Sequence, residues 1–413
     1  MTAPTLLALI LAALLAQLCV GVGFAVWRAR VTAGEPAAPG PDAAPRPPPG
    51  AWTGWRTFRI ARREVEDIAQ TQVSFHLEPV DGEPLPPFRP GQYLTVSVVC
   101  PGPPAAPGPR TLTRCYSLSD RPDPARYRIT VKRVGPPADR PDLPPGVVSN
   151  HLHDAGCVGG EIRLRCPAGA FVLDDDIATP AVLIAGGVGI TPVMSMVQWS
   201  RTAQPGRPIY VYYAVRHGGE HAFKPALEAI ATADPAFRLT VAYSRPGPRD
   251  RPGVDFQHAG RIDMGLLEGT LGEGRRAVYV CGPPAMMETL VPALRARGVA
   301  EDDLHFEAFG PATGQAPSGA AQRPDLAAEP LDVAFRSSGR TLSWDGLDAN
   351  LLDFAERNGI AVESGCRTGA CGACETRVLA GTVRYVETPG FDVSPGHCLL
   401  CVGAPASPLR LEA

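Results

Sequence analysis

The sequence predicts a multidomain protein with four parts: an N-terminal transmembrane helix, an antiparallel β-barrel, an α/β domain with a parallel sheet, and a small C-terminal domain that carries clustered cysteines. Three observations support this fold class. An apolar run covers residues 6–27, β-like runs give way near residue 180 to strands that alternate with helices, and three cysteines fall within 366–374. The length of 413 residues is enough for about three globular domains.

The composition argues against two classes of protein. The formal net charge is −3, so no general attraction to nucleic acid is expected. Eleven cysteines in 413 residues, most of them scattered, do not form a disulfide scaffold and fit a reducing compartment.

The apolar run at 6–27 is long enough for a membrane helix, because about 1.5 Å per residue carries it across the roughly 30 Å hydrocarbon core. Trp27 stands at the expected interface, and Arg28 and Arg30 follow, which by the positive-inside rule places the C-terminal side in the cytoplasm. We expect 1–31 to be a single-pass anchor in the inner (plasma) membrane, with cytoplasmic catalytic domains. A cleaved signal peptide is the alternative, weakened because no Lys or Arg precedes the run.

Residues 32–51 are rich in Pro, Ala and Gly and are expected to be a spacer. Residues 52–178 alternate β-like runs with Pro/Gly turns and show no helical stretch, which predicts an antiparallel barrel or sandwich. The candidate strands are 72–78, 92–99, 127–134 and 161–165.

Residues 179–310 alternate strands with helices, which predicts a parallel sheet covered on both faces. The candidate strands are 181–185, 209–215, 238–243 and 277–281, and helices are expected near 222–232, 263–271 and 284–297. A second linker covers 311–330 and leads to a final domain at 331–413. There, β-runs at 331–335 and 376–386 and a helix near 348–358 are expected.

Two strand ends in the α/β domain resemble nucleotide-binding turns. Each apolar strand runs into a turn that opens a helix, where backbone N–H groups and the positive helix end meet. Carboxyl ends of parallel strands share one edge of a sheet, so the two turns are expected to converge on one crevice. The first turn lacks the G-x-G-x-x-G fingerprint, and glycine also serves such turns for steric reasons alone. The residues concerned are Gly186, Gly187, Gly189, Thr191 and Pro192 at the first end, and Cys281, Gly282 and Pro283 at the second.

The cysteines near the C-terminus have the spacing of a plant-type [2Fe–2S] cluster. Cys366, Cys371 and Cys374 form C-x4-C-x2-C, and Cys401 follows. Glycines between them leave room for the backbone to wrap around the cluster. Buried thiols or a zinc knuckle are the alternatives, but zinc sites usually contain two C-x2-C pairs, and only one is present.

Several motifs together resemble the ferredoxin–NADP reductase superfamily. Arg114-Cys115-Tyr116-Ser117 resembles its R-x-Y-S flavin motif, Phe88–Tyr93 its F-x-P-G-Q-Y strand, and Gly146–Leu152 its G-x-x-S-x-x-L element. The two strand ends are similar to its nucleotide motifs, and Glu307–Gly310 to the segment whose aromatic covers the flavin. With the cysteine domain, the domain order resembles the phthalate dioxygenase reductase type, which implies a flavin-binding β-barrel and a β-grasp ferredoxin domain.

The resemblance implies roles for individual residues. Arg114 would pair with the flavin phosphate, Tyr116 would stack on the isoalloxazine, Ser117 would donate to flavin N5, Ser149 would hold the pyrophosphate and Phe309 would cover the flavin. Near the nicotinamide we expect Thr191 and Cys281, with Glu307 assisting proton transfer or hydrogen bonding. Taken alone, Tyr116 would more often be an ordinary barrel-core aromatic and Arg114 a surface charge, and it is the shared motif that favours the flavin roles.

Three choices stay open at this point. FAD is favoured over FMN, because the G-x-x-S-x-x-L element is more typical of FAD binders. NADH and NADPH are not distinguished: Ser244, Arg245, Arg249 and Arg251 suit a 2′-phosphate but equally suit a solvated turn. Cys401 is favoured over Cys398 as the fourth ligand, because in the family the last ligand precedes a short stretch and a final alternating strand, here Leu409–Leu411.

We therefore expect a membrane-anchored electron-transfer enzyme that takes hydride from NAD(P)H, splits the electron pair at the flavin and passes single electrons through the cluster to a protein acceptor such as an oxygenase. Two alternatives are direct reduction of quinone or of a membrane oxygenase or desaturase, and a tethered redox sensor. The intact flavin and nucleotide motifs argue against the sensor.

Overall fold

The computed structural model describes three folded regions of the chain. The described residues are 50–102, 108–136, 141, 145–309, 330–362, 364, 365, 367, 369, 371–385, 389, 391 and 393–413. The predicted membrane helix at 6–27 lies outside them, as do residues 32–49 of the predicted spacer at 32–51 and residues 311–329 of the predicted linker at 311–330.

Two predictions need correction: the transmembrane helix in the fold class and the location in the inner membrane. Across the described ranges from residue 50 onward, no helix is both long and apolar enough to cross a bilayer. The transmembrane helix is therefore removed from the fold class, and the predicted inner-membrane location is withdrawn with it. The described fold is that of three β-containing domains.

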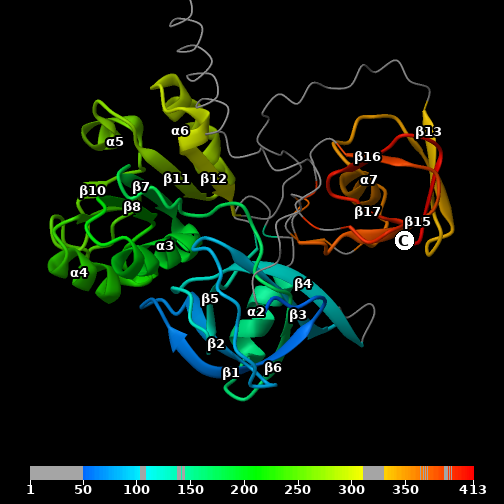
Figure 1. The fold of residues 1–413 in the computed structure, drawn as a ribbon, viewed down its shortest axis with the longest axis horizontal. Helices are drawn as coiled ribbons and strands as arrows, with labels where there is room; N and C mark the ends of the chain where they lie inside the picture. Colours follow the sequence, from blue (N-terminus) through cyan, green and yellow to red (C-terminus); the bar gives the residue numbers. More distant parts are fainter. Residues whose placement is uncertain are drawn as a thin grey trace, which may run out of the picture. The chain divides into compact units, whose positions relative to one another are not determined.

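The first domain is built on a six-stranded antiparallel sheet (Figure 1). In spatial order its strands are β4 (Pro109–Ser117), β3 (Tyr93–Pro101), β6 (Glu161–Leu164), β1 (Arg56–Val65), β2 (Gln72–Pro79) and β5 (Tyr127–Lys132). A bridge between Leu118 and Ile129 joins the two edges, so the sheet curls into a barrel. Helix α2 (Val147–Ala155) packs on the barrel core through Val148 and Leu152.

The second domain is a parallel sheet covered on both faces. Its strands in spatial order are β10 (His258–Ala259), β9 (Phe237–Tyr243), β8 (Ile209–Val215), β7 (Ala181–Gly186), β11 (Ala277–Gly282) and β12 (Leu304–Ala308). Helices α3 (Ile190–Ala203) and α4 (Lys224–Ala233) lie on one face, and α5 (Met264–Leu271) and α6 (Pro284–Ala296) on the other (Figure 1). Each face of the sheet has its own hydrophobic core. Of two adjacent residues of β7, Leu183 belongs to one core and Val182 to the other.

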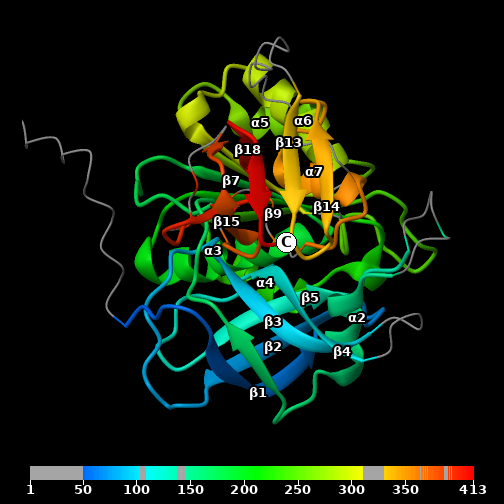
Figure 2. The ribbon, with the colours of Figure 1, turned by 90° about the vertical axis from the view of Figure 1, so that its right-hand side faces the viewer.

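The C-terminal domain has a five-stranded mixed sheet and a short two-stranded sheet (Figure 2). The larger sheet contains β14 (Arg340–Trp344), β13 (Leu331–Phe335), β19 (Leu409–Leu411), β15 (Glu375–Ala380) and β17 (His397–Leu399), and the smaller pairs β16 (Val383–Tyr385) with β18 (Gly403–Pro405). Helix α7 (Leu351–Arg357) contributes Leu351 and Phe354 to the core that this sheet covers. The predicted single β-run at 376–386 is thus two strands, separated by Gly381 at φ +91°.

The chain passes from the barrel to the parallel sheet through residues 165–180, which are bonded to the barrel along the way. Ala168 exchanges two backbone hydrogen bonds with Tyr93, and the Leu173 N–H donates to Pro90 O at 3.0 Å. Between these contacts, Gly91 has φ +107°, and a Cβ placed on it would lie 2.1 Å from Phe171 O. Only glycine allows the two backbones to approach this closely.

We predict that Gly91→Ala destabilises the protein much more than Gly82→Ala. Gly82 has φ +73° but nothing within 4 Å of its Cβ position, so alanine there carries backbone strain alone, about 1 kcal/mol. At Gly91 the backbone of Phe171 must also move, which adds roughly 2 kcal/mol or more. Urea unfolding of both variants measures the difference, and equal midpoints would contradict the predicted close contact.

Candidate functional site

Strands β3 and β4 bring the two predicted flavin motifs together. In their antiparallel register Tyr93 lies opposite Ser117 and Leu94 opposite Tyr116. Leu118 N–H donates to Gln92 O at 2.9 Å, which continues the pairing beyond the strand end. The F-x-P-G-Q-Y and R-x-Y-S segments therefore form one local surface of the barrel.

The side chains of the R-x-Y-S motif differ in how they are held. Ser117 is only 4% exposed, and its Oγ has no hydrogen-bond partner among the described residues. Tyr116 packs against the barrel core, and burial raises the pKa of its hydroxyl. Arg114 is exposed, with its guanidinium donating to Thr113 O at 2.7 Å. A buried hydroxyl without a partner beside a phenol and an exposed guanidinium fits a flavin ring with a phosphate tail.

Ser149 lies on the first turn of α2, in a region where the sequence showed no helical stretch. Its Oγ donates to Gly146 O at 3.2 Å, and the helix begins at Gly146 without a side-chain cap. Backbone N–H groups at the start of this helix are thus available to an anionic group, as the predicted pyrophosphate role requires.

The two predicted nucleotide turns converge, because β7 and β11 are neighbouring parallel strands that end at the same level. A Cβ on Gly189 would lie 2.1 Å from Cys281 O, one on Gly282 would lie 3.1 Å from Gly186 Cα, and one on Gly186 would lie 2.8 Å from Pro283 Cδ. Glycine at these three positions is therefore a steric requirement. Gly187 differs: it has φ +55°, and its Cβ position is open apart from Lys132 Nζ at 4.0 Å.

Cys281 and Glu307 lie side by side, because they are register partners in the parallel pair β11–β12. Cys281 is fully buried, and burial, followed by the charge of Glu307, raises the pKa of its thiol well above the usual value. Phe309 follows Glu307, and its N–H donates to Gly282 O at 2.7 Å. Its half-buried ring packs against the core of the parallel-sheet domain.

Thr191 and Pro192 are buried in the first turn of α3, and Thr191 Oγ1 donates to Val188 O at 2.9 Å. The threonine hydroxyl thus stabilises the glycine-rich turn through a hydrogen bond to the turn's own backbone. The outer face of the turn is therefore formed by Gly187, and the barrel strand β5 lies next to it.

Lys132 on β5 was not predicted from the sequence, although it stands closest to Gly187. Its Nζ forms an ion pair with Glu220 at 2.8 Å, and Gln72 Nε2 donates to Glu220 O at 3.2 Å. These bonds join the barrel to the segment after β8. No sequence signal links residues so far apart, so only the fold reveals this basic group beside the turn.

The residues considered for a 2′-phosphate are arranged after β9. Arg251 is paired with Asp255, with Nε 3.1 Å from Oδ2. Ser244 donates to Val215 O at 3.4 Å, and Arg245 and Arg249 are exposed. Arg251 is therefore already engaged, and Arg245 and Arg249 are the better candidates.

Three of the four predicted cluster ligands are described, and Cys366 lies outside the described residues. The sulfur atoms of Cys374 and Cys401 are 3.1 Å apart, and the Cys401 N–H donates to Cys374 Sγ at 3.4 Å. Ala373 N–H donates to Cys371 Sγ at 3.4 Å. N–H groups directed at sulfur suit thiolate ligands of an anionic cluster.

The loop around these cysteines has no room for larger residues. A Cβ on Gly365 would lie 2.7 Å from Cys371 Sγ, and one on Gly372 would lie 2.4 Å from the Phe391 ring. Arg367, at φ +61°, forms ion pairs with Asp353 and Glu356, which tie the loop to α7. The loop therefore fits a compact cluster.

Comparisons with known proteins agree with these three domains. Residues 183–291 match the family described as oxidoreductase NAD-binding domain, and residues 335–405 match the 2Fe-2S iron-sulfur cluster binding domain. A flavohemoprotein of Chromobacterium violaceum is 39% identical over 261 residues, which are 63% of this chain and 62% of that protein. The chain thus spans less than two thirds of the length of the first curated relatives it matches.

Two solved structures are similar to large parts of this chain. The flavohem-like FAD/NAD binding domain of nitric oxide dioxygenase from Vibrio cholerae is 31% identical, with 62% of this chain and 99% of that chain aligned at a TM-score of 0.51. Phthalate dioxygenase reductase is 25% identical, with 87% of this chain and 98% of that chain aligned at a TM-score of 0.50.

These matches confirm the cofactors expected from the motifs: FAD, a [2Fe–2S] cluster and NAD(P)H. The chain belongs to the ferredoxin–NADP reductase superfamily and joins its flavin- and nucleotide-binding reductase to a C-terminal [2Fe–2S] ferredoxin domain.

Proposed function

We propose that an oxygenase accepts the electrons that this NAD(P)H-dependent oxidoreductase passes through FAD to its [2Fe–2S] cluster. The observation that carries the proposal is the presence, in one chain, of converging nucleotide turns at Gly186 and Gly282 and of paired sulfurs at Cys374 and Cys401. Phthalate dioxygenase reductase has this combination of domains and is named for its dioxygenase partner. The match to the flavohemoproteins covers 63% of this chain, and it supports the donor side of the proposal and not the acceptor.

The chain's residues divide the work of binding and orientation. Arg114 and the N–H groups at the start of α2, with Ser149, hold the phosphates of FAD, while Tyr116 supports the ring and Ser117 donates to N5. FAD supplies hydride acceptance and single-electron release when it is bound. The residues of the two strand-end turns surround the nucleotide. They are Gly186, Gly187, Gly189, Thr191, Pro192, Gly282 and Pro283.

Cys281 and Glu307 complete the hydride-transfer region. The buried thiol contacts the nicotinamide. Glu307, beside Cys281 on the neighbouring strand, forms a hydrogen bond or assists proton transfer. Phe309 limits access of water. Cys366, Cys371, Cys374 and Cys401 bind the cluster.

The test uses the purified full chain reconstituted with FAD, iron and sulfide. Under anaerobic conditions NADH or NADPH is expected to bleach the flavin and then produce the electron paramagnetic resonance signal of the reduced cluster. Addition of an oxidised terminal oxygenase of the Rieske or haem class is expected to remove that signal. A cluster that dithionite reduces but neither nicotinamide does would contradict the proposal.

We predict that Ser117→Ala slows hydride transfer to the flavin by about tenfold or more, because a hydrogen-bond donor directed at the reacting atom is lost. The matched control is Ser119→Ala, since the Ser119 hydroxyl is already bonded to Thr130 at 2.8 Å. The control should lower stability without slowing hydride transfer. Stopped-flow measurement of flavin bleaching by NAD(P)H compares the variants, and equal rates would count against the role of Ser117.

We predict that Cys401→Ser abolishes the cluster and that Cys398→Ser retains it. Cys398 is 1% exposed and belongs to the hydrophobic core, and burial, followed by the neighbouring Cys374, raises the pKa of its thiol to about 12. Iron content and visible absorption after reconstitution measure the result. Loss of the cluster in Cys398→Ser with retention in Cys401→Ser would reverse the assignment.

A further inference from the structure

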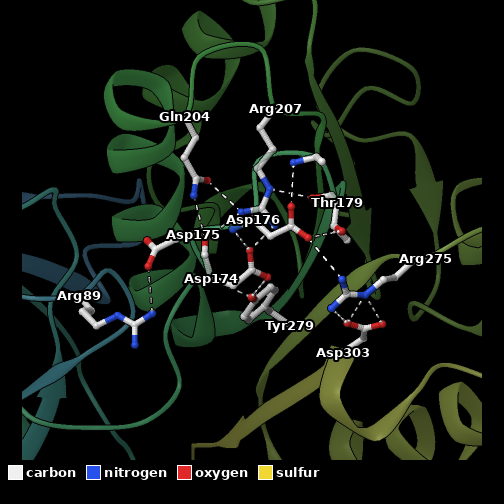
Figure 3. Close-up of polar contacts among 11 residues, drawn as sticks. Arg89, Asp174, Asp175, Asp176, Thr179, Gln204, Arg207, Arg275, Tyr279 and Asp303 are labelled. Carbon is white, nitrogen blue, oxygen red and sulfur yellow. Dashed lines mark hydrogen bonds and ion pairs between the residues drawn. The ribbon is translucent and has the colours of Figure 1, made fainter. Parts of the chain in front are cut away.

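Two adjacent residues connect the flavin barrel to the nucleotide strands. The Leu173 N–H donates to Pro90 O at 3.0 Å, on the barrel side. The next residue, Asp174, accepts a hydrogen bond at Oδ2 from the Tyr279 hydroxyl at 2.8 Å, on the parallel-sheet side (Figure 3). The connection between the domains is therefore bonded on both sides within two adjacent residues.

The barrel side of this connection leads directly to the flavin motif. Pro90 precedes Gly91 and Gln92, and Tyr93 then pairs with Ser117 across β3 and β4. Because Gly91 packs against the backbone of Phe171, this stretch has no room to slide. A displacement of Leu173 would be transmitted to the strand that holds Ser117.

The nucleotide side leads directly to Cys281. Tyr279 stands two residues before Cys281 on β11, so both side chains point to the same face of the sheet. The Tyr279 ring makes an edge contact with Phe171 and stacks on His305 at 4.6 Å between ring centroids. Its hydroxyl also accepts from the Asp174 N–H at 3.0 Å. Tyr279 thus links Asp174 to the strand of the proposed nicotinamide site.

Arg207 fixes Asp174 from the other side. Its side chain is 0% exposed, and its Nη2 lies 2.9 Å from Asp174 Oδ1. The same guanidinium donates to Asp174 O at 3.0 Å, to Thr179 O at 2.9 Å and to Gln204 Oε1 at 2.9 Å (Figure 3). Five N–H groups in a rigid fork can hold several acceptors of one segment in fixed directions.

The energetic balance favours a positional role for these contacts. Removing the Arg207 guanidinium from water costs much of what its attraction to the Asp174 carboxylate returns, and that carboxylate is itself 35% exposed, so the pair adds little net stability. The pair does determine the position and orientation of Asp174, because both of its carboxylate oxygens and its backbone carbonyl are bonded to other residues. Hydride transfer is sensitive to such placement, since a misplacement of about 1 Å can cost about a hundredfold in rate.

We propose that Asp174, held by Arg207 and Tyr279, is a positioning residue that sets the separation between the nicotinamide strand and the flavin strand. The inference rests on the proposed roles of Ser117 and Cys281. It assigns a function to a cluster that touches neither reacting group and that the sequence motifs do not include.

The decisive variant is Tyr279→Phe, which removes one hydroxyl and keeps the ring between Phe171 and His305. We expect flavin bleaching by NAD(P)H to slow by about tenfold, with loss of the nicotinamide–flavin charge-transfer absorbance. FAD content and reduction of the cluster from photoreduced flavin should equal those of the wild type. Hydrogen exchange should accelerate at the Asp174 amide, which loses its acceptor, and stay slow at the Leu173 amide. Asp174→Asn, which is isosteric, should slow bleaching in the same way.

Arg275→Gln is the matched control. Arg275 is 62% exposed, and its ion pair with this segment is made to Asp176, at 3.4 Å, and not to Asp174. Its removal should leave the bleaching rate and the charge-transfer absorbance unchanged, and a tenfold slowing in this variant would overturn the specific role of Asp174.

Ser117→Ala, measured in the same assay, separates two kinds of failure. A slow Ser117→Ala with a wild-type rate in Tyr279→Phe overturns the positioning role alone, even if the Asp174 amide exchanges faster. Wild-type rates in both variants overturn the proposed hydride-transfer site as well.

Discussion

The close approach of two strand ends is the constraint on which the nucleotide site depends. β7 and β11 are neighbours in the parallel sheet, and where they end, the Cβ positions of Gly189 and Gly282 are within 3.1 Å of the other strand's backbone. Any larger residue would separate the strands and displace Cys281. Because side chains are excluded there, backbone N–H groups and helix ends form the surface. On the other side of β11, the parallel register with β12 places Glu307 beside Cys281.

The parts of the fold that the sequence predicts well are those with continuous apolar strands. The runs at 209–215 and 331–335 coincide with β8 and β13, because buried strands of such sheets need apolar residues throughout or on one face. β1 was missed because four arginines interrupt Arg56–Val65, and much of this strand faces solvent. α2 was missed because it is short and begins at Gly146, without the side-chain cap that marks a helix start.

Some residues of the candidate site can be predicted from the sequence, and others cannot. Residues that belong to short local motifs, such as Arg114 to Ser117, can be recognised by their resemblance to a family motif, and the cysteine run can be recognised from its spacing. Contacts between distant segments cannot. Lys132 and Glu220, or Asp174 and Tyr279, carry no local pattern, and each pair exists only because the barrel and the parallel sheet meet. The residues that orient the domains are therefore the least visible in the sequence, although the chemistry relies on their placement.

The protonation state of Cys281 limits what this residue can contribute. Burial and the charge of Glu307 raise the pKa of the thiol, so it stays neutral at physiological pH. In the proposed site, a thiolate would place negative charge beside the nicotinamide and would stabilise its positively charged oxidised form, which would hold the product. A neutral thiol offers a small polarizable contact instead. In the proposed site, Cys281 therefore contributes shape and not charge.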